Sequence, residues 1–161
     1  MDIPASKPGY RALRRGRWSE PGRIYLMTTV AHAREKRFAE WEAASVVCGA
    51  MSEAETWPGA KLLCWVLMPD HWHGLVHLED PIRLDRLVGL AKGRSARALI
   101  AAQERTGPVW MSGFHDRALR REENLLDAAR YVVANPLRSG LVERIADYPY
   151  WDSIWVEERR G

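Results

Sequence analysis

Residues 61–78 read KLLCWVLMPDHWHGLVHL, and this stretch decides the fold that we expect for the chain. Lys61–Met68 is a run of apolar residues of the length of a buried strand. Pro69-Asp70 is a turn signal, and His71–Leu78 is a second run of strand-like composition. The two runs therefore predict an antiparallel hairpin.

The segments around this hairpin complete a recognisable order of elements. Before the hairpin we expect a strand at 23–30 and a helix at 35–55, whose inward stripe would contain Phe38, Trp41, Ala44 and Cys48. After the hairpin we expect a helix at 81–104, bent or interrupted at Gly93, and then an extended segment with a fourth strand within 109–119. A helix at 121–135 would end at Pro136, and the aromatic residues of the tail would pack back on the domain. The order β-α-β-β-α-β followed by a helix predicts an α+β, ferredoxin-like sandwich, with an antiparallel sheet and helices packed on one face.

Charge is concentrated at the start of the chain. Residues 1–23 contain six basic residues against Asp2 and Glu20, a local charge of +4, whereas the other 138 residues sum to −1. A basic arm at 1–22, ahead of a domain at 23–161, is typical of nucleic-acid binding because basic side chains neutralise phosphates. A solubilising tail explains the charge equally well.

The composition shows no signal for a membrane span, for secretion or for a cysteine metal site. No apolar run approaches the ~18 residues of a membrane span, and the N-terminus lacks a secretory signal, so we expect a cytoplasmic protein. Cys48 and Cys64 lie in apolar segments without metal-type spacing, which predicts two buried free thiols.

Two histidines of the predicted hairpin are candidate metal ligands. His71 and His73 are two residues apart on a strand, so their side chains project from the same face and can share one ion. His77 lies on that face too but is further along. Ordinary half-buried histidines satisfied by hydrogen bonds would give the same pattern, and two imidazoles alone are too few ligands for a firm site.

The helix expected at 121–135 offers a completion. Asn124, Asp127, Tyr131 and Asn135 follow one another at spacings of three and four and so share a face. If this helix docks over the histidines, the Asn135 amide oxygen can join them on a cation such as Mg²⁺ or Mn²⁺, and Tyr131 can attack a phosphate as nucleophile. A surface tyrosine and an asparagine at a helix end are the alternative reading.

Taken together, these stretches resemble the single-tyrosine HUH transposases, and specifically the REP-associated tyrosine transposases. MPDHWHGLVHL (68–78) is similar to the family's M-P-D/N-H-x-H metal motif, and YVVANPLRSGLV (131–142) is similar to its tyrosine block. Further similarity lies in residues 16–29, 92–99 and 107–125. Val133 and Trp72 depart from the pattern, since relatives frequently have a histidine and a smaller apolar residue at these positions.

The resemblance implies an activity and a site. His71, His73 and Asn135 would be the metal ligands, with Mg²⁺ or Mn²⁺ as the ion, and Tyr131 would be the nucleophile that forms a 5′-phosphotyrosine. The substrates would be single-stranded or hairpin-forming DNA of the repetitive extragenic palindrome (REP) type. A monomer is expected, with a helix-exchanging dimer as the alternative.

Two basic groups are the expected DNA contacts: Arg14, Arg15 and Arg17 in the arm, and Lys92, Arg94 and Arg97 beside Gly93. Trp18 can stack on an unpaired base or be buried, and His115 and Asp116 can support the site or merely belong to a strand. Two other functions remain open. One is a domesticated hairpin-binding protein without strand transfer, and the other is a metal-dependent phosphodiesterase that uses water as the nucleophile.

Overall fold

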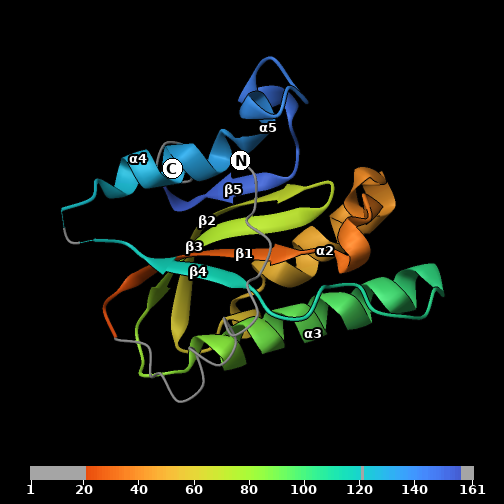
Figure 1. Cartoon of the computed structure of the whole chain (residues 1–161), viewed down its shortest axis with the longest axis horizontal. Coiled ribbons are helices and arrows are strands. Elements are labelled where there is room, and N and C mark those ends of the chain that lie inside the picture. Colours follow the sequence, from red (N-terminus) through yellow and green to blue (C-terminus); the bar gives the residue numbers. More distant parts are fainter. Residues whose placement is uncertain (1–20, 121, 157–161) are drawn as a thin grey trace.

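A five-stranded antiparallel sheet forms the centre of the computed structural model, which describes residues 21–120 and 122–156 (Figure 1). The strands are β1 (Ile24–Val30), β2 (Ala60–Met68), β3 (His71–Leu78), β4 (His115–Ala118) and β5 (Trp151–Ser153), in the spatial order β4-β1-β3-β2-β5. The helices are α2 (Trp41–Ser52), α3 (Leu84–Gln103), α4 (Leu125–Val133) and α5 (Asn135–Arg138), and short 3-10 helices lie at His32–Arg34, Arg37–Ala39, Ala54–Thr56 and Ile145–Asp147.

The expected α+β class is confirmed. The order β4-β1-β3-β2 is the one that a β-α-β-β-α-β chain forms in a ferredoxin-like sandwich, and all its pairings are antiparallel. β5 extends the sheet beyond β2 and was not anticipated. It comes from the aromatic tail, which packs back on the domain as expected.

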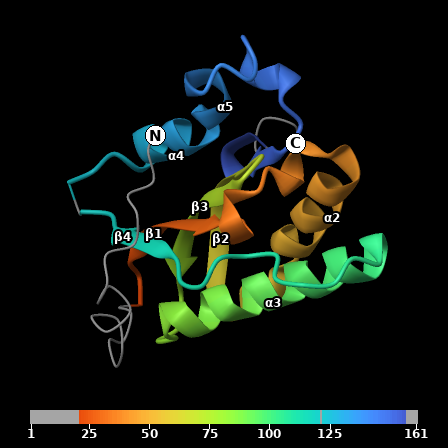
Figure 2. The same ribbon diagram turned by 45° about the vertical axis from the view of Figure 1, so that its right-hand side comes forward.

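Helices cover both faces of the sheet, whereas helices on one face only were expected. α2 and α3 lie on one face and α4 lies on the other, as two views of the molecule show (Figures 1 and 2). Each face has its own core. The larger core contains Phe38, Trp72 and Leu87, whereas the smaller one contains Leu75 and Val132.

The first helix differs from its prediction. It begins at Trp41, and residues 35–40 instead include a 3-10 helix whose Phe38 amide donates to the Pro69 carbonyl in the hairpin turn. Phe38 is buried as expected, but Trp41 is 73% exposed and does not belong to an inward stripe. The inward face of α2 is formed by the small side chains around Val47.

The two later helices differ in their details. α3 continues through Gly93, so the expected interruption there is wrong. α4 begins after Asn124, whose Oδ1 accepts a hydrogen bond from the Asp127 amide at 3.1 Å as an N-cap. α4 ends at Val133, before Pro136 as expected, and the proline itself lies in the first turn of α5, where a missing amide hydrogen is tolerated.

Smaller expectations about the chain can also be compared with the structure. Cys48 and Cys64 are both free thiols; Cys64 is buried as expected, whereas Cys48 is only partly buried. Across residues 21–120 and 122–156, no helix has both the length and the apolar character that a membrane crossing requires.

Trp72, the residue between the two histidines, explains the glycine that follows them. Its indole points into the larger core, is fully buried, and stacks on Trp57 with ring centroids 5.4 Å apart. Gly74 lies on the same face two residues later. A Cβ at Gly74 would come within 2.5 Å of the Trp72 ring and 3.0 Å of the Cys64 carbonyl oxygen. The glycine therefore provides the space that the large indole occupies.

We predict that Gly74→Ala lowers the free energy of unfolding by about 1–3 kcal/mol, the usual cost of overpacking a core. Urea denaturation of the purified variant measures the change. Adding Trp72→Phe should make the alanine less costly than it is in the wild-type background, because the colliding ring becomes smaller. Equal costs of the alanine in both backgrounds would contradict this explanation.

Candidate metal and tyrosine site

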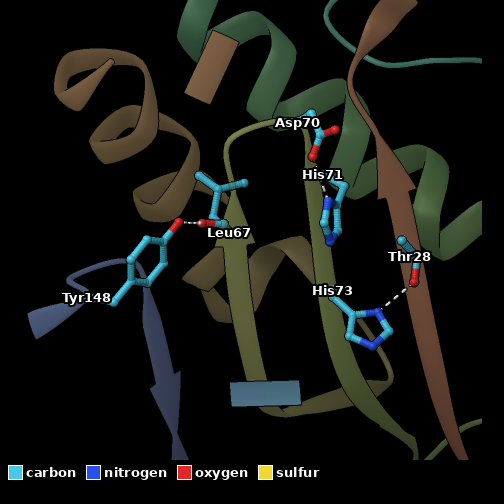
Figure 3. A network of polar contacts seen from close by, with 6 residues as sticks. All are labelled: Thr28, Leu67, Asp70, His71, His73 and Tyr148. Atoms are coloured by element: carbon cyan, nitrogen blue, oxygen red, sulfur yellow. Dashed lines mark hydrogen bonds and ion pairs between the residues drawn. The ribbon is translucent and has the colours of Figure 1, made fainter. Parts of the chain in front are cut away.

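The histidine pair lies on the central strand and faces α4. β3 is hydrogen-bonded between β1 and β2, and His71 and His73 project from the same face of it, as predicted (Figure 3). Leu75, two residues beyond His73, belongs to the smaller core under α4, which identifies that face. His73 is only 1% exposed and His71 is 9% exposed.

A threonine from the neighbouring strand orients His73. Thr28 lies directly opposite His73 in the β1–β3 pairing, and its Oγ1 is 2.6 Å from His73 Nδ1. An imidazole that coordinates a metal through Nε2 carries its hydrogen on Nδ1, and here that hydrogen would be donated to the Thr28 hydroxyl oxygen. The contact thus suits the tautomer that metal binding requires.

His71 has a corresponding partner in the hairpin turn. Its Nδ1 is 2.8 Å from Asp70 Oδ1, within hydrogen-bonding distance (Figure 3). The hydrogen bond from His71 is the main cause that lowers the pKa of Asp70, so this carboxyl group is a carboxylate at neutral pH. A carboxylate behind a histidine is a common arrangement at metal sites, because it fixes the ring and makes the other nitrogen a better ligand.

Two buried polar atoms near this face have no hydrogen-bond partner. They are His73 Nε2 and Asn135 Nδ2. Asn135 is the first residue of α5 and is 3% exposed. Leaving such atoms unsatisfied is costly. A cation on His73 Nε2 would satisfy the first, and half a turn of the Asn135 amide would present its oxygen where the nitrogen lies.

The donor set therefore fits a divalent cation, provided that Asn135 takes part. Among the residues that the structure describes, no group of three or more His, Cys, Asp and Glu side chains is placed to hold a metal. His71 and His73 supply two nitrogen ligands, and the Asn135 amide oxygen is the candidate for the third. Mixed nitrogen and oxygen ligands suit Mg²⁺ and, better, Mn²⁺.

Burial keeps His73 uncharged. Loss of water is the main cause that lowers its pKa from 6.5 to about 4, and the nearby charges of His71 and Arg138 act in the same direction. At neutral pH the ring is a neutral base, which is the form that binds a cation. The effect of Arg138 also shows that its guanidinium, on α5, lies within electrostatic reach of this imidazole.

Tyr131 lies on the helix that covers the histidine face. α4 packs on β2 and β3 through Ala129 and Val132, while Tyr131 remains 41% exposed. The guanidinium carbon of Arg138 lies 3.8 Å from the centre of the Tyr131 ring. One arginine thus contacts the tyrosine and also acts electrostatically on His73.

The expected DNA contacts divide into two groups. Arg14, Arg15 and Arg17 lie outside the described residues, as do Trp18 and the rest of 1–20. Lys92, Arg94 and Arg97 lie on α3, across the sheet from the histidines, so the structure does not bring them to the site.

Two of these α3 side chains also have partners within the domain. Lys92 Nζ donates to the carbonyl oxygens of Met111 and Gly113 at 2.6 and 2.8 Å, and Arg94 forms an ion pair with Glu53 at 2.5 Å. The first contact holds the segment before β4 against α3.

His115 and His77 lie on the sheet outside the pair formed by His71 and His73. His115 on β4 lies opposite Thr28 and therefore shares the face of His71 and His73, one strand beyond Thr28. Asp116, the next residue, projects from the other face. His77 lies near the far end of β3, opposite Ile24.

Sequence reasoning missed three contributors to the site: Thr28, Asp70 and Arg138. Asp70 could have been found, because it directly precedes His71. Arg138 lies in the tyrosine block at 131–142, so a basic residue near the proposed nucleophile was present in a stretch already singled out. Thr28 carries no signal of its own, since only the pairing of β1 with β3 assigns it to His73.

Comparisons with known proteins give one family match and several structures with the same fold. Residues 23–134, which include His71, His73 and Tyr131, match the sequence profile described as "Transposase IS200 like". No curated protein matches the chain. Two solved structures share the fold at low identity.

One is a REP-associated tyrosine transposase bound to a REP hairpin, with a TM-score of 0.64 and 17% identity over 84% of this chain and 79% of that one. The other is a protein of Deinococcus radiodurans R1 assigned to the transposases, with a TM-score of 0.54 and 20% identity over 73% of this chain and 93% of that one.

We predict that the metal-free protein loses stability as the pH falls from about 6.5 to about 4. In this window the unfolded chain protonates His73 but the folded protein does not, so the free energy of unfolding declines, by roughly 3 kcal/mol in total. Urea denaturation in EDTA measures this at each pH. The slope of the free energy of unfolding against pH counts the protons that are taken up on unfolding, and His73→Gln should lower that number by up to one. An unchanged slope in this variant would contradict the role given to His73.

Proposed function

Because this chain belongs to the family of IS200-like transposases, we propose that it cleaves and rejoins single-stranded DNA through a covalent bond between Tyr131 and a DNA 5′-phosphate. The observation that carries the proposal is the buried, unpartnered His73 Nε2, on the face over which the helix bearing Tyr131 is packed. A neutral imidazole in that position is suited to a cation beside the phosphate that a tyrosine attacks.

The reaction proceeds in two reversible halves. Tyr131 Oη loses its proton and attacks the phosphorus, a new O–P bond forms, and the bond from phosphorus to the 3′ oxygen breaks to release a protonated 3′-OH. In the second half, a 3′-OH attacks the phosphotyrosine, the phosphodiester re-forms, and Tyr131 regains its proton. The phosphotyrosine conserves the energy of the phosphodiester, so rejoining needs no external energy source.

The residues around the tyrosine prepare this chemistry. Asp70 and Thr28 fix the two imidazoles, and His71, His73 and Asn135 would hold the cation. The chemistry that a bound Mg²⁺ or Mn²⁺ supplies is polarisation of the scissile phosphate and stabilisation of the charge that develops on its oxygens. Tyr131, which is partly exposed on α4, remains accessible to a strand from solvent.

Hairpin-forming DNA of the REP type is the proposed substrate. The proposal is supported by a solved relative with the same fold that is bound to a REP hairpin. Arg14, Arg15 and Arg17 are proposed contacts to the DNA backbone. Of the α3 group, Arg97 is the most exposed and is proposed as a contact for DNA that extends around the sheet. A monomer is proposed, because α4, which bears Tyr131, packs on β2 and β3 of its own sheet.

We predict that the protein forms a covalent adduct when it is incubated with a labelled REP-type hairpin and Mn²⁺. The adduct migrates as a protein–DNA species on a denaturing gel. Tyr131→Phe should lower its yield by at least about 1,000-fold, because the nucleophile is absent. Tyr150→Phe is the matched control, since that tyrosine belongs to the tail and not to α4, and it should retain the adduct.

The outcomes separate the three functions. Efficient cutting without an adduct would replace the proposal with a water-dependent phosphodiesterase. Tight hairpin binding with neither cutting nor adduct would replace it with a DNA-binding protein that has lost strand transfer.

We predict further that Mn²⁺ raises the melting temperature of the DNA-free protein. Saturation at 100 times the dissociation constant stabilises by about 2.7 kcal/mol, which corresponds to about 5–10 °C for a domain of this size. His73→Ala and Asn135→Ala should abolish the increase, whereas His77→Ala on the same strand should preserve it. An increase that survives both site variants would place the ion elsewhere.

A further inference from the structure

Arg138 has a position that the proposed reaction does not yet use. α5 begins with Asn135 and ends with Arg138, three residues later, so one helical turn presents both side chains on the same side. From there the Arg138 guanidinium reaches back over the Tyr131 ring, with its carbon 3.8 Å from the ring centre. It therefore lies beside the proposed nucleophile and one turn from the proposed third ligand.

Arg138 differs from nearby arginines, which form ion pairs with carboxylates. Arg130 pairs with Asp127 and Arg144 pairs with Asp147, each at 3.2 Å. Within the described residues, no carboxylate forms an ion pair with Arg138, and its guanidinium instead lies over the ring of Tyr131. An exposed cation held against a ring, and not against an anion, remains available for an anion from outside the protein.

The location of this cation matches one phosphate in particular. Its guanidinium touches the Tyr131 ring and lies on α5, the helix that begins with Asn135, so this cation lies beside the proposed nucleophile and close to the proposed third ligand. A guanidinium over a ring keeps N–H donors at its edge, where they can form a paired hydrogen bond with two phosphate oxygens. Lysine has neither the planar stacking surface nor this fork.

We propose that Arg138 binds the non-bridging oxygens of the scissile phosphate while its guanidinium holds the Tyr131 ring in line for attack. This inference rests on the function proposed above. The ligand is a phosphodiester of single-stranded DNA, and the residue has two tasks: it orders the nucleophile before DNA arrives, and it neutralises charge on the phosphate during the transfer.

The first test compares adduct formation in single turnover at saturating hairpin DNA and Mn²⁺. Arg138→Ala should slow the step by about 100-fold, the usual consequence of removing one donor to a developing oxyanion. Arg138→Lys should recover only part of the loss. Arg144→Ala removes a similarly exposed arginine that has its own carboxylate, and it should react like the wild type. A wild-type rate in Arg138→Ala would overturn the proposal.

The second test asks whether the arginine acts on the phosphate or only on the tyrosine. Binding is measured in a Tyr131→Phe background, with a natural hairpin and with one whose scissile phosphate is replaced by an uncharged methylphosphonate. The replacement should weaken binding when Arg138 is present and have little further effect in Arg138→Ala. The salt dependence of binding to natural DNA should also become shallower by about 0.7 in the alanine variant.

The outcomes of the two tests are distinct. If the methylphosphonate penalty is the same with and without Arg138, the arginine does not bind that phosphate and the proposal is wrong, even if adduct formation is slow. If the wild-type protein binds hairpins but forms no adduct, the proposed function fails, while the methylphosphonate comparison still decides whether Arg138 contacts the phosphate. Thermal melting of Arg138→Ala verifies that the variant is folded.

Discussion

The pairing register between β1 and β3 is the constraint on which the site depends. It places Thr28 opposite His73 and directs both histidines towards α4. A slip by one residue would turn every side chain of β3 to the other face. The register is held because Trp72 and Val76, which alternate with the histidines, are buried in the larger core. The apolar residues between the two histidines are therefore as necessary for the geometry of the proposed site as the histidines are.

Much of the fold was predictable because it follows from local rules. Alternation of side chains is a property of the extended backbone, so the hairpin and the shared face of His71 and His73 could be predicted from eighteen residues, 61–78. The resemblance to transposases that rests on this hairpin and the tyrosine block is confirmed by the family match. The predicted start of the first helix was wrong, because the Phe38 amide donates a hydrogen bond to the Pro69 carbonyl oxygen, and this contact joins two distant parts of the chain.

The features that could not be predicted depend on contacts with distant parts of the chain, or on which of two local functions a side chain takes. Thr28 resembles any threonine in a strand until its opposite residue is known. β5 exists because the short segment Trp151–Ser153 finds the free edge of β2, and nothing in three residues predicts that pairing. Asn124 has the helical spacing of a fourth member of the Tyr131 face, yet its side chain caps α4 because free amide hydrogens at a helix start attract it more strongly.

The sheet also separates the interior into two hydrophobic cores that differ in composition. The larger core, between the sheet and α2 and α3, holds most of the buried aromatic residues, including the stacked pair of Trp57 and Trp72. The smaller one lies under α4, next to the residues of the proposed site. Because the two are divided by a layer of backbone, side chains around α4 can be exchanged with little disturbance of the opposite side. Such a partition would let the proposed substrate preference change by substitution around α4 while the architecture itself persists.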